Sequence, residues 1–289
     1  MQEAIFMLYK GRTDIATECF RQLDGSARAL TEKQGVAAAR EQLHGLELMA
    51  VEILNEQGSQ ALGKPIGKYF TLDLPQRFER GAEQFEAAAQ AVGELIRRCC
   101  KKHDSILVAA LGNPDITPDA LGSLAASSII VTRHLKQQAP ADFAAFSSLA
   151  LSRPGVLGTS GIESAQQVKL LCSRLSPDLV IVIDALAGAD MGRLCRCVQV
   201  SSAGISPGSG VGNDRQELSA ETLGVPVIAI GIPTVIDAGI LGEEGLSGLF
   251  VTPRSIDALV RSGARVIAYG INLAVHQGLG IGDIDMLVS

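Results

Sequence analysis

The sequence contains no tryptophan, and its 8 phenylalanines and 3 tyrosines make up only 4% of the 289 residues. Proteins that bind single-stranded nucleic acids rely on aromatic platforms on which bases stack, so this composition argues against that class. Positive charge is also scarce: 25 Lys and Arg stand against 31 Asp and Glu, which leaves a net charge of −6. A nucleic-acid-binding surface needs a cationic stripe to displace counterions. We therefore expect no nucleic-acid partner.

Motifs that bind metals or form disulfide frameworks are absent as well. The six cysteines include no C-x-x-C pair, and none of the four histidines lies at zinc-ligand spacing from a cysteine pair. Reduced thiols, as in the cytoplasm, are the simpler expectation. We expect neither a metal nor another cofactor.

Signals for export or membrane insertion are missing too. Residues Met1 to Arg12 mix charged and apolar side chains and contain no clean apolar core before a cleavage site. The longest uncharged stretch, Leu223 to Ile236, is interrupted by two prolines and a glycine, so it does not predict a membrane span. The sequence thus favours a cytoplasmic protein without a membrane partner.

What the sequence does contain is a large apolar fraction, 47% of its residues, which suffices for one large core or two small ones. Continuous apolar runs predict buried strands, and they alternate with stretches of helical periodicity. The strands are expected at residues 105–112, 178–186, 197–201 and 225–233, and the helices over 77–102, from Thr117, after a capping box at Ser160–Glu163 and from Thr252. This alternation predicts a single α/β domain with a central, mostly parallel sheet flanked by helices.

The chain before residue 77 is less regular. Residues 46–54 and 66–74 predict two strands joined by a glycine-containing turn, and residues 1–32 have the loose pattern of a leader. The stretch ahead of Arg12 shows no core periodicity, so its removal should cost no buried surface.

Two aspartates are placed where α/β enzymes carry their chemistry, beyond the carboxyl ends of predicted strands. Asp184 follows four apolar residues of a buried strand, which favours the neutral acid, whereas Asp119 is expected at the second position of a helix whose free N–H groups favour ionisation. A charged carboxylate near a protonated one is the arrangement that acid–base hydrolysis needs. The residue pattern alone favours the alternative, in which both aspartates are ordinary caps.

Two nearby segments hold further candidates. Asn113 and Asp115 either line the site or make local Asx-turns. The glycine-rich loop at residues 207–213 lacks the lysine and hydroxyl residue of a phosphate-binding loop. We therefore expect Gly208 and Gly210 to let the backbone approach the site instead.

The order of motifs along the chain resembles that of the germination proteases of spore-forming bacteria. The matching segments are 12–16 (RTDIA), 63–69 (GKPIGKY), 111–113 (LGN), 117–122 (TPDALG), 153–156 (RPGV), 161–163 (GIE), 177–180 (PDLV), 183–187 (IDALA), 207–213 (PGSGVGN), 221–230 (ETLGVPVIAI) and 266–270 (VIAYG). The resemblance implies a single α/β domain similar in fold to the hydrogenase-maturation endopeptidases. It also implies that Asp119 and Asp184 are the catalytic pair.

The resemblance further implies an endopeptidase of the spore compartment that degrades small acid-soluble spore proteins at germination and forms a homotetramer. Two alternatives stay open. In one, the chain is a metal-binding maturation endopeptidase whose two aspartates ligate a divalent ion. In the other, it is a paralogue that binds spore proteins without cutting them.

A zymogen is also implied. Substrates of the family carry an acidic residue followed by an apolar residue, Ala, a small residue and Glu, and residues 14–18 of this chain (DIATE) have this shape. We therefore expect a propeptide of residues 1–14, cut between Asp14 and Ile15, ahead of a peptidase domain of residues 15–289. Without the resemblance, the pattern at this place favours an ordinary helix cap.

Overall fold

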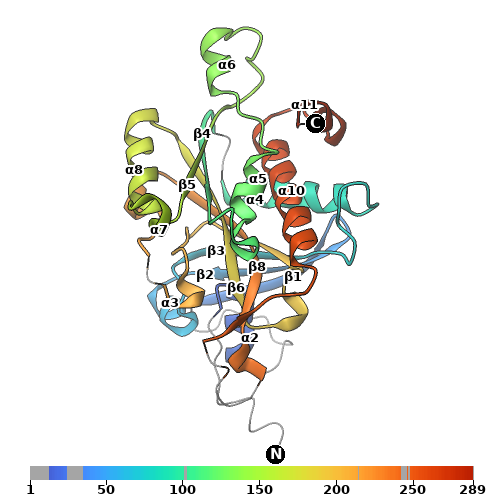
Figure 1. Cartoon of the computed structure of the whole chain (residues 1–289), viewed down its shortest axis with the longest axis vertical. Coiled ribbons are helices and arrows are strands. Elements are labelled where there is room, and N and C mark those ends of the chain that lie inside the picture. Colours follow the sequence, from blue (N-terminus) through green and yellow to red (C-terminus); the bar gives the residue numbers. More distant parts are fainter. Residues whose placement is uncertain are drawn as a thin grey trace, which may run out of the picture.

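The structure, a computed structural model, describes residues 13–24, 35–100, 103–213, 215–241, 246 and 248–288. Of the expected propeptide, residues 1–12 lie outside the described residues, and only Thr13 and Asp14 are described. The described residues fold around a nine-stranded sheet, as Figure 1 shows.

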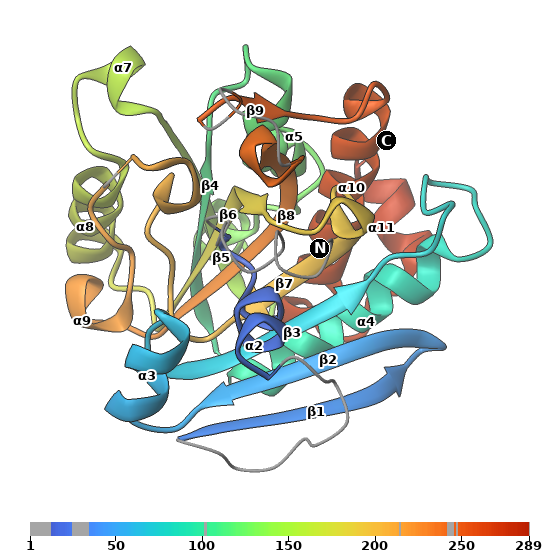
Figure 2. The ribbon, with the colours of Figure 1, turned by 90° about the horizontal axis from the view of Figure 1, so that it is seen from below.

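The sheet is mixed, with strand order β1-β2-β3-β7-β8-β6-β4-β5 and β9 paired to β8 beyond this path (Figure 2). Its strands are β1 Val36–Leu43, β2 Leu46–Ile53, β3 Gly67–Asp73, β4 Ser105–Leu111, β5 Ser148–Gly155, β6 Leu179–Gly188, β7 Cys197–Ser201, β8 Val227–Asp237 and β9 Phe250–Val251. The pairs among β8, β6, β4 and β5 are parallel, whereas β1, β2, β3, β7 and β9 pair antiparallel with their neighbours. The α/β class and the central sheet are thus as predicted, but the expectation of a mostly parallel sheet is wrong. Three of the eight strand pairs are parallel and five are antiparallel, because the chain before residue 77 adds antiparallel strands to one side of the sheet.

The helices cover both faces of this sheet. They are α2 Ala16–Asp24, α3 Glu56–Leu62, α4 Phe85–Cys99, α5 Leu121–Ala126, α6 Arg133–Gln138, α7 Leu157–Ser160, α8 Ser164–Leu175, α9 Ala220–Leu223, α10 Ile256–Val275 and α11 Ile281–Val288, with short 3-10 turns η1 Thr117–Asp119, η2 Met191–Arg193, η3 Ser209–Val211 and η4 Ala238–Leu241. In the views of Figures 1 and 2, α4, α5 and α10 lie on one side of the parallel strands and α8 on the other.

Alternating side chains of the parallel strands supply two cores. In β6, Ile181 and Ile183 pack in a cluster with residues of α4, α5 and α10, whereas Val180 and Val182 pack in a second cluster with residues of α8. Because successive side chains of a strand point to opposite faces, one continuous apolar run serves both clusters. This explains why strands such as β6 carry no alternating polar positions.

The antiparallel half carries a third core, which corrects the expectation of a loose leader. Ala16 and Phe20 of α2 pack with Val51 and Tyr69 of the sheet. Ile15 and Ala16 are both 0% exposed. In the described part of residues 1–32, the chain from Ile15 onward therefore belongs to the folded domain, although its polar surface residues disguise this in the sequence.

Several local expectations are also wrong. A short helix, α3, replaces the simple turn between β2 and β3. The capping box is absent, because Gly161 (φ +70°) ends α7, so Ser160 closes one helix and α8 begins after Glu163 without a side-chain cap. Thr117 does not cap a helix either: it is the first residue of the 3-10 turn η1, and its hydroxyl donates to Asp257.

Candidate active site

Asp184 lies where the parallel pairing of β4 and β6 stops. The last paired residues are Ala110 and Ile183, so Asp184 is the first residue of β6 beyond its pairing with β4, while it stays paired to Gly231 of β8. It is only 4% exposed. The apolar run before it therefore carries a carboxyl group to the end of the neighbouring strand and keeps it out of water.

Asp119 reaches the same end of the sheet through a tight loop after β4. Gly112 has a φ of +95°, and a Cβ atom there would lie 1.9 Å from the carbonyl oxygen of Asp119, so only glycine lets this loop close. The Asn113 N–H donates to Oδ2 of Asp119 at 2.8 Å. Asp119 is thus the last residue of a 3-10 turn, and a loop N–H replaces the helix N–H groups that the sequence predicted.

The two carboxyl groups differ in their affinity for protons. Burial raises the pKa of Asp184 well above its usual range, and the charges of Asp119 and Asp14 raise it further. Burial also raises the pKa of Asp119, against the hydrogen bond from Asn113. This corrects the expectation that the surroundings of Asp119 favour ionisation outright. Because Asp184 is the more deeply buried acid and faces like charges, it keeps its proton to a higher pH.

One cavity of about 410 Å³ brings most of the expected site together. Asp119, Asp184 and Gly208 line it, and Gly210 lines an adjoining cavity of about 330 Å³. Asp14 lines both. The residue before the expected cleavage point therefore lies at the junction of the two cavities.

Asn113 and Asp115 lie at the border of this site. Asn113 contributes its backbone N–H to Asp119, and its side-chain oxygen accepts the Asp115 N–H at 3.0 Å. Asp115 is exposed, and it is not among the residues that line either cavity. The two residues therefore form the Asx-turn that was one of the two expectations for this segment.

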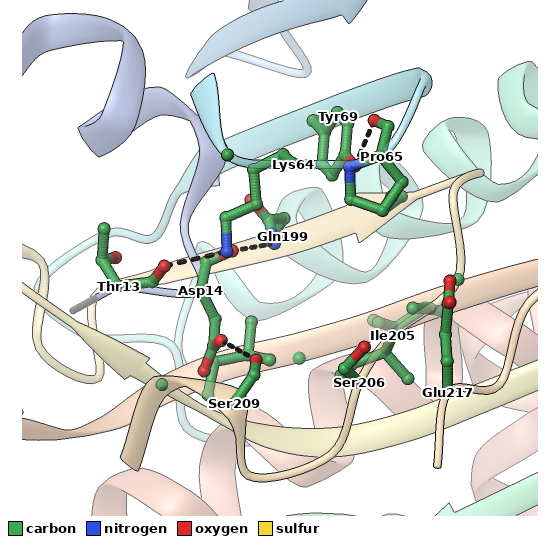
Figure 3. A pocket seen from close by; sticks show the side chains of 18 residues that line it. Thr13, Asp14, Lys64, Pro65, Tyr69, Gln199, Ile205, Ser206, Ser209 and Glu217 are labelled. Carbon is green, nitrogen blue, oxygen red and sulfur yellow. Dashed lines mark hydrogen bonds between the residues drawn. The ribbon is translucent and has the colours of Figure 1, made fainter. Parts of the chain in front are cut away.

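Gln199 is a site residue that no sequence motif indicated. It lies in β7, is 6% exposed, and faces the adjoining cavity shown in Figure 3. Its Nε2 donates to the Asp14 carbonyl at 3.0 Å, and its Oε1 accepts the Ala16 N–H at 2.8 Å. One side chain thereby brackets the Asp14–Ile15 peptide bond. The available signal was a single amide inside the buried run CVQVS.

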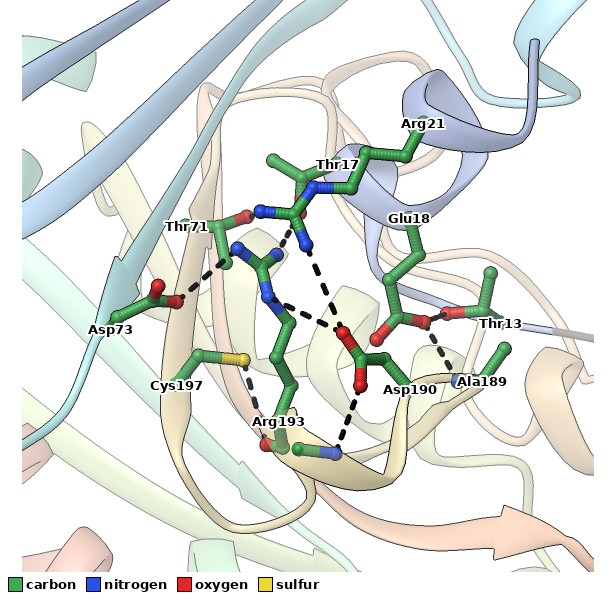
Figure 4. A network of polar contacts seen from close by, with 11 residues as sticks. Thr13, Thr17, Glu18, Arg21, Thr71, Asp73, Ala189, Asp190, Arg193 and Cys197 are labelled. Atoms are coloured by element: carbon green, nitrogen blue, oxygen red, sulfur yellow. Dashed lines mark hydrogen bonds and ion pairs between the residues drawn. The ribbon is translucent and has the colours of Figure 1, made fainter. Parts of the chain in front are cut away.

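A second polar network lies under α2 (Figure 4). Glu18 is 4% exposed; its Oε2 accepts the Ala189 N–H at 2.7 Å and the Thr13 hydroxyl. Its Oε1 is buried and has no hydrogen-bond partner among the described residues. Arg193 donates to the Thr17 hydroxyl at 2.6 Å. Side chains and backbone of the folded domain therefore hold the DIATE segment along its whole length.

We expect Glu18→Gln to stabilise the uncut chain at about pH 8, with a gain that disappears below pH 4.5. Burial raises the pKa of Glu18 above 4.5, so the folded state binds the proton more tightly than the unfolded state, and stability is lost as the pH rises through the folded pKa. Glutamine avoids this loss and retains an oxygen for the Ala189 N–H. Urea unfolding over this pH range measures the effect.

The matched control for this substitution is Glu56→Gln. Glu56 also stands in the first turn of a helix, α3, but is exposed. Both variants are best measured in the Asp184→Asn background, which is not expected to cut itself. Equal effects of the two substitutions at every pH would contradict the prediction.

The structure also bears on metals, thiols and membranes. Across residues 13–24, 35–100 and the later described ranges, no group of three or more His, Cys, Asp or Glu is placed to hold a metal ion. All six cysteines are free. Among the helices of the described residues, none has the length and apolarity that a membrane crossing requires.

The chain is similar to known germination proteases over almost its whole length. The family model described as germination protease matches residues 14–247. A germination protease from Caldanaerobacter subterraneus subsp. tengcongensis is 40% identical, with 96% of this chain and 98% of that protein covered. One from Clostridium perfringens is 34% identical, with 98% and 100% covered, and one from Bacillus cereus is 41% identical over 80% of this chain and 64% of that protein.

Among solved structures, the NiFe hydrogenase maturation protease HycI from Thermococcus kodakarensis KOD1 matches with a TM-score of 0.35 and 19% sequence identity. The match covers 62% of this chain and 99% of that one. The sequence relatives decide the assignment, because two of them match at 34–40% identity over nearly their full length. The chain belongs to the germination protease family.

Proposed function

We propose that this chain is an aspartate-dependent endopeptidase that degrades small acid-soluble spore proteins in the cytoplasm of the germinating spore, as a homotetramer. The observation that carries the proposal is the pair Asp119 and Asp184 in one cavity, with the proton held more tightly by Asp184. A hydrolase that uses acid–base chemistry needs one group of each kind. The family assignment supplies the peptidase activity and the link to germination.

In the proposed mechanism, ionised Asp119 takes a proton from a water molecule in the cavity, and the water oxygen attacks the carbonyl carbon of the peptide bond. Protonated Asp184 donates its proton to the carbonyl oxygen, which gives a gem-diol intermediate. As this intermediate collapses, Asp119 passes the proton that it took from water to the leaving nitrogen, and Asp184 takes its proton back from one hydroxyl group. The C–N bond breaks, the carbonyl carbon keeps the hydroxyl group, and the nitrogen gains a hydrogen. The two acids titrate as a coupled pair, so their roles can exchange.

A digest of a spore-protein extract with the purified protein tests this proposal. We expect the small acid-soluble proteins to disappear, with the same rate in the presence of a chelator. Loss of activity with chelator and recovery with a divalent metal would favour the maturation-type endopeptidase instead. Binding of the spore proteins without any cleavage would favour the paralogue. Light scattering on the same preparation tests the tetramer.

The proposal includes a zymogen that cuts itself between Asp14 and Ile15. Its support is the position of Asp14, which lines the cavity of the two aspartates and whose charge raises the pKa of Asp184. The bond that follows is bracketed by Gln199. The helix that the simpler interpretation predicted is present as α2, beginning at Ala16, so the cut falls at its entrance and leaves the helix in the domain.

Incubation of the wild-type chain at mildly acidic pH is therefore expected to produce a new amino terminus at Ile15. Intact-mass measurement detects the loss of residues 1–14. The Asp184→Asn variant should keep its full mass under the same conditions, whereas Asp115→Asn, altered at an exposed acid of the same loop, should be processed normally. A fully active preparation whose mass has not changed would show that activity does not depend on this cut.

A further inference from the structure

The side chain of Asp14 occupies a recess formed by Ala187, Ser209 and Gly210, called the carboxylate recess below. Oδ2 of Asp14 accepts the Ala187 N–H at 2.8 Å, and Oδ1 accepts the Ser209 hydroxyl at 2.8 Å. Figure 3 shows Ser209 and Asp14 pointing toward each other. Each oxygen of the carboxylate has its own donor, and such charge-assisted bonds are about twice as strong as neutral ones.

The glycine-rich loop closes this recess tightly. A Cβ atom at Gly210 would lie 2.4 Å from Oδ2 of Asp14 and 2.6 Å from Cβ of Ala187. Contacts this short have no room for a methyl group, so the loop reaches the carboxylate only because residue 210 is a glycine. The sequence predicted that the loop 207–213 approaches the site. In the structure, this close approach forms a slot that fits a carboxylate.

The backbone around Asp14 is held as firmly as its side chain. The Asp14 N–H donates to the Ala187 carbonyl at 2.8 Å, its carbonyl accepts from Gln199, and Lys64 Nζ donates to the Thr13 carbonyl at 2.9 Å. All of these partners lie after residue 15. A cut between residues 14 and 15 therefore removes the occupant and leaves every group that bound it in the protein.

Resting on the proposed function, we propose that the carboxylate recess is the subsite for the side chain that precedes the cut bond in a protein substrate. Asp14 fills it in the uncut chain, and an aspartate or glutamate of another protein fills it after processing. Gln199 then donates to the carbonyl oxygen of the cut bond, as it does to that of Asp14 in the uncut chain. The recess binds a carboxylate because the Ala187 N–H and the Ser209 hydroxyl both donate to it. The close contact with Gly210 leaves no room for bulkier side chains at the position of the carboxylate.

The recess also explains how the first product leaves. Hydrolysis converts the Asp14 carbonyl into a second carboxylate on the same residue. Asp14 lines the same cavity as Asp119, which is ionised in the proposed mechanism, so a second negative charge on residue 14 adds to the repulsion and favours release. The subsite is thereby cleared for the next acidic residue.

Two blocked peptides test the subsite with the processed enzyme: GRTDIATE, which copies residues 11–18, and GRTLIATE. We expect wild type to prefer the aspartate peptide. Ser209→Ala should lower kcat/KM for that peptide by about 10- to 100-fold and leave the leucine peptide unchanged, because the lost hydrogen bond is made to a charged group. Ser173→Ala, on the exposed face of α8, is the matched control.

A second measurement needs no catalysis. Asp14→Ala empties the recess in the full chain, and acetate at about 200 mM, against chloride at equal ionic strength, should then raise Tm by about 1 °C or more. Asp14→Ala/Gly210→Ala should not respond, because its methyl group fills the slot. Wild type, whose recess holds Asp14, should not respond either.

The outcomes separate the two proposals. Equal cleavage of both peptides, or an equal loss on both caused by Ser209→Ala, overturns the subsite while the peptidase stands. An acetate response confined to Asp14→Ala, in a protein that digests no spore protein, supports the recess and rejects the peptidase. No acetate response in Asp14→Ala overturns the recess whatever the activity.

Discussion

Asp184→Asn is expected to reduce peptide cleavage by about 10²- to 10⁴-fold, which is the range that general acid–base catalysis supplies. Asparagine has the same shape as the protonated acid but has no acidic proton to donate. Asp119→Asn should cost a similar factor, because an amide cannot accept a proton from water at neutral pH. Initial rates on a spore-protein substrate measure both losses.

The folding of these variants should be intact, and that of Asp184→Asn even favoured above neutral pH. Burial raises the pKa of Asp184, so the folded state loses stability as the pH rises through that pKa, and a neutral amide does not. Asp115→Asn, four positions before Asp119 and exposed, is the control that should keep wild-type rates. Full activity in either Asp184→Asn or Asp119→Asn would remove that residue from the proposed pair.

The second large effect is expected from Gly112→Ala. The new methyl group would lie 1.9 Å from the carbonyl oxygen of Asp119 at a backbone φ of +95°, so the loop must open and carry Asp119 away from Asp184. We expect a loss of roughly 2–5 kcal/mol in the free energy of unfolding, together with most of the activity. Chemical denaturation and the cleavage assay report the two losses separately.

Gly45→Ala provides the comparison. Gly45, in the turn between β1 and β2, has a φ of +79° but nothing within 4 Å of an added Cβ, so it carries the backbone strain alone, about 1–2 kcal/mol. The difference between the two variants measures the close approach at Asp119. If both lose the same stability and neither loses activity, the loop does not position Asp119 in the way described.

The sequence located one catalytic candidate better than the other. The position of Asp184 was predictable because it directly follows four apolar residues of a buried strand. Such a strand places the residue that follows it at the edge of the sheet. The placement of Asp119 depended on a loop, and loops are decided by contacts such as that of Asn113 with the carboxylate, which periodicity does not reveal. The expected helix start at Thr117 therefore became a 3-10 turn.

The pairing of the strands was also predictable only in part. The apolar runs of β4, β6 and β8 identify them as central strands, but β7 carries a similar run and pairs antiparallel with β8. Composition cannot distinguish these two arrangements, because both bury the strand on two faces. β1, β5 and β9 were not predicted. β1 and β5 lie at the two edges of the strand order and include polar residues and a proline in place of an apolar run, and β9 has only two residues.

The contacts of Gln199 and of the carboxylate recess with Asp14 could not be predicted from the sequence, for another reason. The groups that hold Asp14 lie 173 to 195 residues further along the chain. Each is ordinary in its local sequence: a glutamine in a strand, a serine in a loop, a main-chain N–H. They come together only in the folded chain, where the parallel and antiparallel parts of the sheet meet, so no local pattern reveals the contacts with Asp14.

The long sequence separation between Asp14 and its partners also affects when these contacts can form during synthesis. Residue 14 leaves the ribosome early, and its partner Ser209 is made 195 residues later, a delay of roughly 10–40 s at about 5–20 residues per second. During most of that interval the growing chain presents its DIATE segment without Asp184 and without the groups that hold the Asp14 side chain, which follow 173 and 195 residues later. The proposed cut between Asp14 and Ile15 therefore has to wait until most of the chain has been made, because it needs both Asp184 and the groups that hold Asp14.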